Sequence, residues 1–257
     1  MDKPFDTHEH LSRIPDLVQV DFLRPLRWLS LGWCDFRANP GASVAQGAIL
    51  AAIGWLILLL CSAQIDLLAA AISGFLLVGP VFGAGFYEMS RLRAAGQTAN
   101  LDAALDGAVR RRKPLALLGG ILAMIAAAWV LVSSMLFARS VDGSPPPLNE
   151  TFYSTVIDWS SSGFLVSYLA TDAAFAFAAF LVSAVSAPMI FDRDIAVRSA
   201  MLTSLRVVAA NPAPMLLWAG MIAALTALGF ATLLFGLIVV LPLLGHATWH
   251  AYRDLVK

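Results

Sequence analysis

Two histidines near the end of the chain have a spacing that could do chemistry. His246 and His250 are four residues apart, so both face one side of a helix, and Arg253 continues the stripe. The pair could hold a metal, although zinc sites use three or four ligands and haem needs a ligand on each face of its ring. With Trp249 and Tyr252 beside them, we interpret these residues as an aromatic and basic belt at a membrane surface. A partner-binding or anionic-lipid site is the first alternative, and a metal or haem site is the second.

Asp172 is the one formally charged residue inside the long apolar segments of the chain. Carboxyl groups in a bilayer are costly and often functional. Because no Lys or Arg lies in these segments to pair with it, we expect Asp172 to be protonated, bonded to Tyr168 or Thr171 on its own helix, or open to water. We interpret it as a tolerated acid near a membrane surface, with a proton or cation site as the alternative.

Glu88 is an acid at the end of another apolar segment, beside Arg91 and Arg93. An internal repeat aligns Glu88 with His250, which would place the two in related positions around an axis. We expect a surface charge here, and a buried acid–base pair is the alternative. The basic run at residues 110–113 is interpreted as a determinant of membrane orientation and a contact for anionic headgroups.

The elements that must position these residues are membrane spans. Hydrophobic residues make up 59% of the 257 residues, charged residues only 13%, and the mean hydropathy is +0.77. These values are typical of a membrane protein, in which one span takes about 20 apolar residues. Residues 41–63, 67–87, 114–138 and 159–191 each suit one span, and residues 207–252 suit two helices that turn near residues 227–230. The sequence therefore predicts an all-α polytopic protein with six transmembrane helices.

The distribution of basic residues predicts the orientation. Of the 17 Lys and Arg residues, 16 fall on one side of the six predicted spans and only Arg139 falls on the other. This positive-inside bias places both termini in the cytoplasm. The formal net charge of +0 argues against nucleic acid as a partner.

The apolar segments form an internal repeat, in which Asn-Pro pairs open the first and fifth spans and a proline falls late in the second and sixth. A weaker third copy lies between them. Each unit of two spans returns the chain to its starting side, so the three units are parallel, with an axis along the membrane normal. The late prolines predict matched bends. The repeat positions are Pro40, Pro80, Gly83, Pro114, Pro188, Pro212, Pro242 and Gly245.

Each opening proline follows a polar, helix-prone stretch, which we predict to be an amphipathic helix on the inner membrane surface. In the first stretch Leu26 and Trp33 belong to the apolar face, and Asp35 lies elsewhere. The predicted organisation is a cytoplasmic tail of residues 1–22 and a membrane domain of residues 23–257. The units of that domain cover about residues 23–93, 98–193 and 194–257.

The ending of the chain, Gly-His-Ala-Thr-Trp-His-Ala-Tyr-Arg-Asp at residues 245–254, resembles a family of uncharacterised multi-pass membrane proteins common in proteobacteria. The resemblance implies a location in the bacterial inner membrane. The family has no established activity, so the resemblance implies no reaction, cofactor or partner.

Three functions are compatible with these features. The first is a non-enzymatic accessory or assembly factor of a larger membrane complex, because spans rich in small residues suit close helix packing. The second is a transporter or channel for a small solute or ion that uses Asp172. The third is a metal- or haem-binding protein that uses His246 and His250. We expect the lipid bilayer and other inner-membrane proteins as partners, and we predict no cofactor.

Overall fold

The computed structural model describes residues 15–61, 65–140 and 163–257. Within these ranges the chain is helical and has no strand; an isolated antiparallel bridge joins Leu17 to Val256. The predicted all-α class is confirmed. The helices are α2 (Arg24–Ala38), α3 (Pro40–Cys61), α4 (Ile65–Phe82), α5 (Ala84–Ala94), α6 (Leu101–Arg110), α7 (Arg112–Ser140), α9 (Phe164–Ser183), α10 (Ser186–Asp192), α11 (Val197–Ala210), α12 (Pro212–Ala231) and α13 (Leu237–Leu255).

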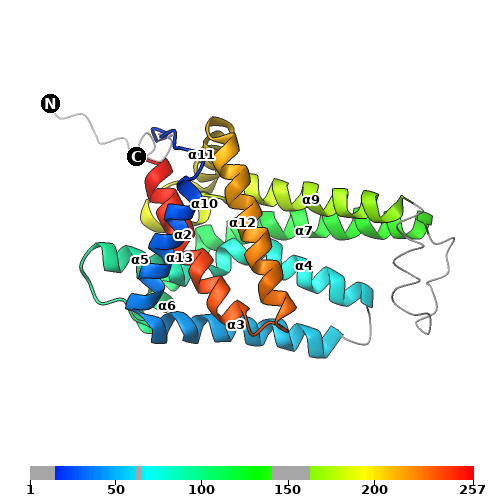
Figure 1. Cartoon of the computed structure of the whole chain (residues 1–257), viewed down its shortest axis with the longest axis horizontal. Helices are drawn as coiled ribbons and strands as arrows, with labels where there is room; N and C mark the ends of the chain where they lie inside the picture. Colours follow the sequence, from blue (N-terminus) through cyan, green and yellow to red (C-terminus); the bar gives the residue numbers. More distant parts are fainter. Residues whose placement is uncertain (1–14, 62–64, 141–162) are drawn as a thin grey trace.

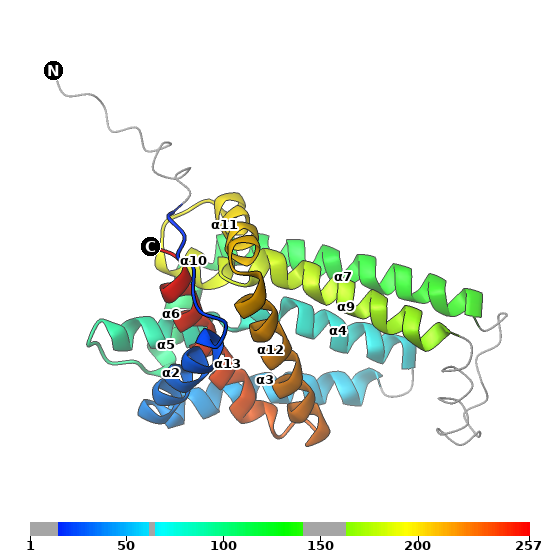
Figure 2. The ribbon, with the colours of Figure 1, turned by 45° about the horizontal axis from the view of Figure 1, so that its top comes forward.

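Four long helices, α3, α4, α7 and α9, lie side by side along the longest axis of the molecule (Figure 1), and each packs on the next. The shorter helices α2, α5, α6, α10 and α11 gather at one end of this bundle together with the second half of α13. We call this end the polar end. Helices α12 and α13 cross one side of the bundle obliquely, as both views show (Figure 2).

Five helical segments are long and apolar enough to cross a membrane, judged on length and composition within the described residues. The sixth predicted span, α13, is not among them, because its second half carries His246, His250, Arg253 and Asp254. The structure thus supports a multi-pass membrane protein with five candidate spans. These are Pro40–Cys61, Ala71–Ala94, Arg112–Leu136, Val166–Asp192 and Pro212–Ala231.

The hairpin of α12 and α13 does not reach as far along the bundle as the two full spans that we predicted. Its turn places Phe235 against Trp55 of α3, with ring centroids 5.4 Å apart, and Leu234 against Gly54. Helix α3 continues for six more residues, about 9 Å, to its end at Cys61. The turn also falls a few residues later than predicted, between Ala231 and Leu237.

The spacing of the prolines explains this difference. Pro40 and Pro80 are 40 residues apart, whereas Pro212 and Pro242 are only 30 residues apart. Helix α12 is only two residues shorter than α3, at 20 against 22, so the second arm takes most of the difference. Pro242 is the sixth residue of α13, whereas Pro80 is the 16th residue of α4, about 15 Å further along a helix.

The two Asn-Pro openings adopt the same local structure. Asn39 has φ −133° and ψ 60°, and Asn211 has φ −132° and ψ 53°. The backbone N–H of each asparagine donates to a carbonyl four residues earlier, and the following proline begins the next helix. Proline suits a first helical turn, where its missing N–H costs nothing, and disfavours helix in the residue before it.

The late prolines do not produce matching breaks. Pro80 precedes a break at Gly83 between α4 and α5, but α13 continues without a break through Pro242 and Gly245. The break nearest Pro188 lies before it, at residues 184–185, between α9 and α10. The matched bends that we expected at Pro80 and Pro242 are therefore not seen as matched helix breaks.

The helices that precede the spans pack in a closed series. Helix α6 packs on α5, α11 packs on α9 and α10, and α2 packs on α13. In terms of the predicted units, this helix of the second unit packs on the first unit, that of the third unit packs on the second, and that of the first unit packs on the third. The spans follow the same order where α7 packs on α4 and α3 packs on α13. The corresponding third pair, α9 and α12, packs together marginally at most within the described residues.

Helix α2 packs on the protein through residues outside its predicted apolar face. Leu26 and Trp33 are 52% and 42% exposed, whereas Gly32 and Asp35 are buried. A Cβ atom at Gly32 would lie 2.7 Å from the backbone nitrogen of Ala247, so α2 and α13 are in backbone contact. The amphipathic pattern located the helix correctly, and the exposure of Leu26 and Trp33 is compatible with an apolar face turned to the membrane, but the pattern did not show that Asp35 is packed against the protein.

Part of the predicted N-terminal tail packs against the rest of the chain. Residues 1–14 lie outside the described residues, but residues 16–20 pack along the end of α13 and the start of α12. The Val18 N–H donates to the Leu255 carbonyl, and the Val20 N–H donates to the Asn211 side chain, at 3.0 and 2.9 Å.

Candidate functional site

A buried polar network joins α2, α3, α5 and α13 at the polar end. At its centre the Asp35 carboxylate accepts hydrogen bonds from Ser90 Oγ at 2.6 Å and His250 Nε2 at 2.8 Å. Its other oxygen pairs with Arg93. Burial by itself would raise the pKa of Asp35, but the hydrogen bonds from His250 and Ser90 outweigh it and leave that pKa below its ordinary value.

His246 extends the network toward α3. Its Nδ1 lies 2.8 Å from Ser90 Oγ and its Nε2 lies 3.1 Å from Ser43 Oγ, while Phe86 packs against the ring edge. The side chain is 1% exposed, and this burial lowers the pKa of His246 to about 4. The imidazole is therefore neutral at pH 7.

The network has one consistent arrangement of protons. Ser90 donates its hydroxyl proton to Asp35, so its oxygen accepts from Nδ1–H of the neutral His246. The unprotonated Nε2 then accepts from Ser43. No buried side-chain polar atom of Asp35, Ser90, His246 or Ser43 is without a partner, which explains how an ion pair and a histidine can be buried together.

The arrangement of Ser43 and His246 is that of a nucleophile beside a general base. However, Ser43 is 0% exposed, and it lines neither of the two cavities described below. Both nitrogens of His246 are occupied, and within the described residues no three His, Cys, Asp or Glu side chains lie where they could hold a metal ion. The contacts of the network are those of a helix-locking core.

Glu88 forms a second buried site, between α5 and α6. It is 1% exposed and accepts two hydrogen bonds from Arg91, at 2.6 and 2.9 Å, and one from Arg110 at 3.1 Å. Gly107 makes room for it, because a Cβ atom there would lie 2.7 Å from the Glu88 side chain. The predicted surface charge is therefore wrong. The partners are arginines rather than the histidine of an acid–base pair.

A polar cavity of about 190 Å³ opens beside this ion pair, at the junction of α5, α6 and α10. Its lining includes the three arginines Arg91, Arg110 and Arg111. Another cavity is small and apolar, about 10 Å³, and lies between α3, α4 and the turn before α13.

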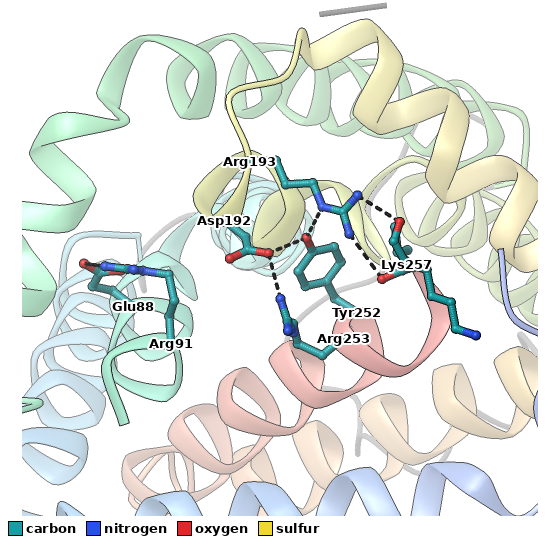
Figure 3. Close-up of polar contacts among 8 residues, drawn as sticks. Glu88, Arg91, Asp192, Arg193, Tyr252, Arg253 and Lys257 are labelled. Carbon is teal, nitrogen blue, oxygen red and sulfur yellow. Dashed lines mark hydrogen bonds and ion pairs between the residues drawn. The ribbon is translucent and has the colours of Figure 1, made fainter. Parts of the chain in front are cut away.

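The end of α13 is clamped to α10 next to the polar cavity (Figure 3). The Tyr252 hydroxyl donates to Asp192 at 2.7 Å and accepts from Arg193 Nε at 2.8 Å. Arg193 also donates to the Val256 and Lys257 carbonyls. Arg253 pairs with Asp192 at 3.2 Å. Burial and the bond to Asp192 raise the pKa of Tyr252, so this phenol stays protonated in the physiological range.

Asp172 stands apart from all of these groups. It lies on α9 and accepts a hydrogen bond from the indole N–H of Trp129 on α7. Thr171, one of the alternative partners considered for Asp172, donates instead to the Ser167 carbonyl, at 2.8 Å.

The structure thus unites some predicted residues and separates others. His250 bonds to Asp35 directly and His246 is linked to it through Ser90, Arg253 joins the clamp at Asp192, and Glu88 and Asp172 have separate surroundings. Sequence reasoning missed the following partners: Asp35, Ser43, Ser90, Trp129, Arg193 and Tyr252 as a hydrogen-bonding residue. A signal for Asp35 existed, because Trp28, Gly32 and Asp35 form one helical stripe in which a glycine invites close packing.

Residues 67–192, just under half of the chain, match the model of a family described as a predicted integral membrane protein, DUF2189. The matched part runs from α4 to α10, includes Glu88 and Asp172, and lies outside residues 245–254, on which the predicted resemblance rested. This part of the chain is similar to a membrane protein family of unknown function. No curated protein and no solved structure matches the chain. The match and the five apolar helices together identify a multi-pass integral membrane protein.

Proposed function

We propose that this integral membrane protein is a non-enzymatic accessory or assembly factor of a larger complex in the bacterial inner membrane. In this proposal a transmembrane helix of the partner docks along α12. The observation that carries it is the unequal packing between spans of neighbouring units. Helix α4 packs closely on α7, and α13 packs closely on α3, but α9 and α12 pack together marginally at most within the described residues.

The outward face of α12 suits a docking helix. Gly220, Ala223 and Ala227 are exposed at helical spacing, and a Cβ atom at Gly220 would meet nothing within 4 Å. Small residues on one face let two helix backbones approach closely in a membrane, where van der Waals packing rather than water drives association.

A non-enzymatic role is supported by the closed state of the groups with catalytic chemistry. Ser43 and His246 are fully enclosed and bonded within the protein, at 0% and 1% exposure. A substrate would have to open the contact between α2, α3 and α13 to reach them.

The topology that we propose has three parallel units with both termini in the cytoplasm. The identical Asn39 and Asn211 junctions and the closed series of packing support the repeat. Most Arg and Lys residues lie at the polar end, which supports a cytoplasmic location of that end. Reporter fusions after Arg93 and Arg193 should be cytoplasmic, and a fusion after Arg139 should be external. A cytoplasmic signal after Arg139 would refute this topology.

The docking proposal is tested by photo-crosslinking in intact membranes. A photoreactive residue at Ala223 should yield one defined protein adduct, and Gly220→Leu should abolish the adduct and the copurification of that protein. Gly120→Leu is the matched control, because Gly120 is an exposed glycine on α7 that also meets nothing within 4 Å. Equal loss with both variants, or a protein that always purifies alone, would contradict the proposal.

A further inference from the structure

The polar cavity at the junction of α5, α6 and α10 is lined by three arginines. Arg91 comes from α5, Arg110 ends α6, and Arg111 joins α6 to α7. Two carboxylates, Glu88 and Asp192, also line the cavity, so its lining carries one more positive than negative charge. This charge suits a monoanion.

Glu88 positions two of the arginines without using all of their donors. A guanidinium has five N–H donors. Glu88 accepts two hydrogen bonds from Arg91 and one from Arg110, and Asp194 accepts one from Arg111. Because Glu88 is 1% exposed, it is an internal brace for these arginines, and their other N–H groups remain available to a ligand in the cavity.

The cavity lies where phosphate groups of a bilayer would be expected. Leu105 and Val109 on α6 are 51% and 57% exposed, while Ala104 and Gly107 on the same helix are buried against the protein. A short helix with one apolar side open to the outside and arginines at its end is typical of a helix that lies in the headgroup layer.

We propose that this cavity binds a phosphate group through Arg91, Arg110 and Arg111. Guanidinium groups match phosphate because their planar fork can donate two parallel hydrogen bonds to its oxygens. The phosphate belongs either to a phospholipid headgroup or to a free phosphate ion. The single net positive charge of the lining fits the phosphodiester of a lipid, with its one negative charge, better than a free phosphate with a larger charge.

The test is calorimetric titration of the purified full chain in detergent. The titrants are dihexanoyl phosphatidylglycerol, sodium phosphate, and dihexanoylglycerol, which lacks the phosphate. The variant Arg110→Gln with Arg111→Gln should weaken binding of the phosphate-bearing titrant at least tenfold. The matched control is Arg112→Gln with Lys113→Gln, which removes the same charge from the same basic run but does not line the cavity; it should weaken binding less than threefold.

Each outcome decides the proposal. Binding of phosphatidylglycerol alone, lost in the cavity variant, supports a lipid headgroup, and equivalent binding of sodium phosphate supports a free ion. Equal weakening by the two double variants would show a general attraction to a basic surface and would overturn the proposed site. Tight binding of dihexanoylglycerol, or no binding of either phosphate titrant, would also overturn the proposal. Arg111→Gln alone should weaken binding at least threefold with an unchanged melting temperature, which separates loss of the site from loss of the fold, because Arg111 pairs with Asp194, whose side chain is 89% exposed.

Discussion

Asp35 and Asp172 are two acids with opposite surroundings. Asp35 lies at the polar end and is bonded to Ser90, His250 and Arg93, from two other helices. Asp172 lies within a candidate span, and the indole of Trp129 donates to it. The first acid holds three helices together, whereas the second joins one neighbouring pair.

The comparison shows that isolation in sequence is a poor guide to the importance of a charge. Asp172 is conspicuous in the sequence because it is the one charged residue of an apolar segment. Asp35 is inconspicuous because it lies among arginines in a polar stretch. The energetic role of a buried carboxylate depends on how many groups would lose their partner without it.

We expect the largest effect from Asp35→Ala. It would leave Ser90, His250 and Arg93 without their shared acceptor, and breaking such a buried pair is strongly destabilising. Breaking a fully buried pair costs about 3–5 kcal/mol of unfolding free energy. Because Arg93 and His250 are partly exposed, at 40% and 23%, we expect a smaller loss of about 2–3 kcal/mol, or roughly 5–10 °C in melting temperature. Thermal unfolding in detergent measures it. An effect no larger than that of Asp172→Ala would remove the distinction between the two acids.

A smaller loss is expected from Gly32→Ala at the contact of α2 and α13. The new Cβ atom would meet backbone atoms of Ala247 at 2.7 and 2.9 Å, and overpacking of this kind costs about 1–3 kcal/mol. Gly120→Ala is the control, since nothing lies within 4 Å there and alanine favours a helix. In circular dichroism melts, Gly32→Ala should therefore lower the melting temperature, whereas Gly120→Ala should leave it unchanged or raise it. Equal shifts would show that α2 is not held by backbone contact.

The polar network should also make stability depend on pH. His246 has a pKa of about 4 when folded and an ordinary value of 6.5, so between these values the unfolded chain binds more protons. The free energy of unfolding should therefore fall as pH drops from 6.5 toward 4. The lowered pKa of Asp35 adds a further loss at still lower pH, below its ordinary value of 3.8.

The variant His246→Gln tests this dependence. It should flatten the change in melting temperature between pH 6.5 and 4, and His8→Gln, in the N-terminal stretch, should leave it unchanged. An unaltered pH profile in His246→Gln would show that another group titrates in this range.

The sequence was sufficient for the helices because hydropathy and proline positions are local properties. Five predicted spans were found, and Pro40 and Pro212 begin α3 and α12 as expected. The sequence also contains a sign that α13 is not a full span, because Pro212 and Pro242 are closer together than Pro40 and Pro80.

The polar network could not be predicted because it depends on which faces meet. Asp35 and His250 are 215 residues apart, and their contact requires the backbone approach of α2 and α13 at Gly32. Nothing local to the helical stripe of His246, His250 and Arg253 separates a membrane-surface belt from a packed core. The structure divides the stripe, because His246 is 1% exposed whereas the Arg253 side chain is 57% exposed.

The smallest effect is expected from Asp172→Asn. The amide oxygen of asparagine can still accept the N–H of Trp129, and no other hydrogen bond to Asp172 is seen in the described residues, so the loss should be within about 0.5 kcal/mol, or roughly 2 °C. Trp129→Phe removes the donor instead and should cost more, because the Trp129 ring is 5% exposed and its truncation leaves unfilled space between α7 and α9. The same pair of variants in sealed vesicles separates a structural Asp172 from a conducting one. If Asp172→Asn abolished a proton or cation flux while its melting temperature stayed unchanged, the isolated acid would carry the function and the networked acid only the fold.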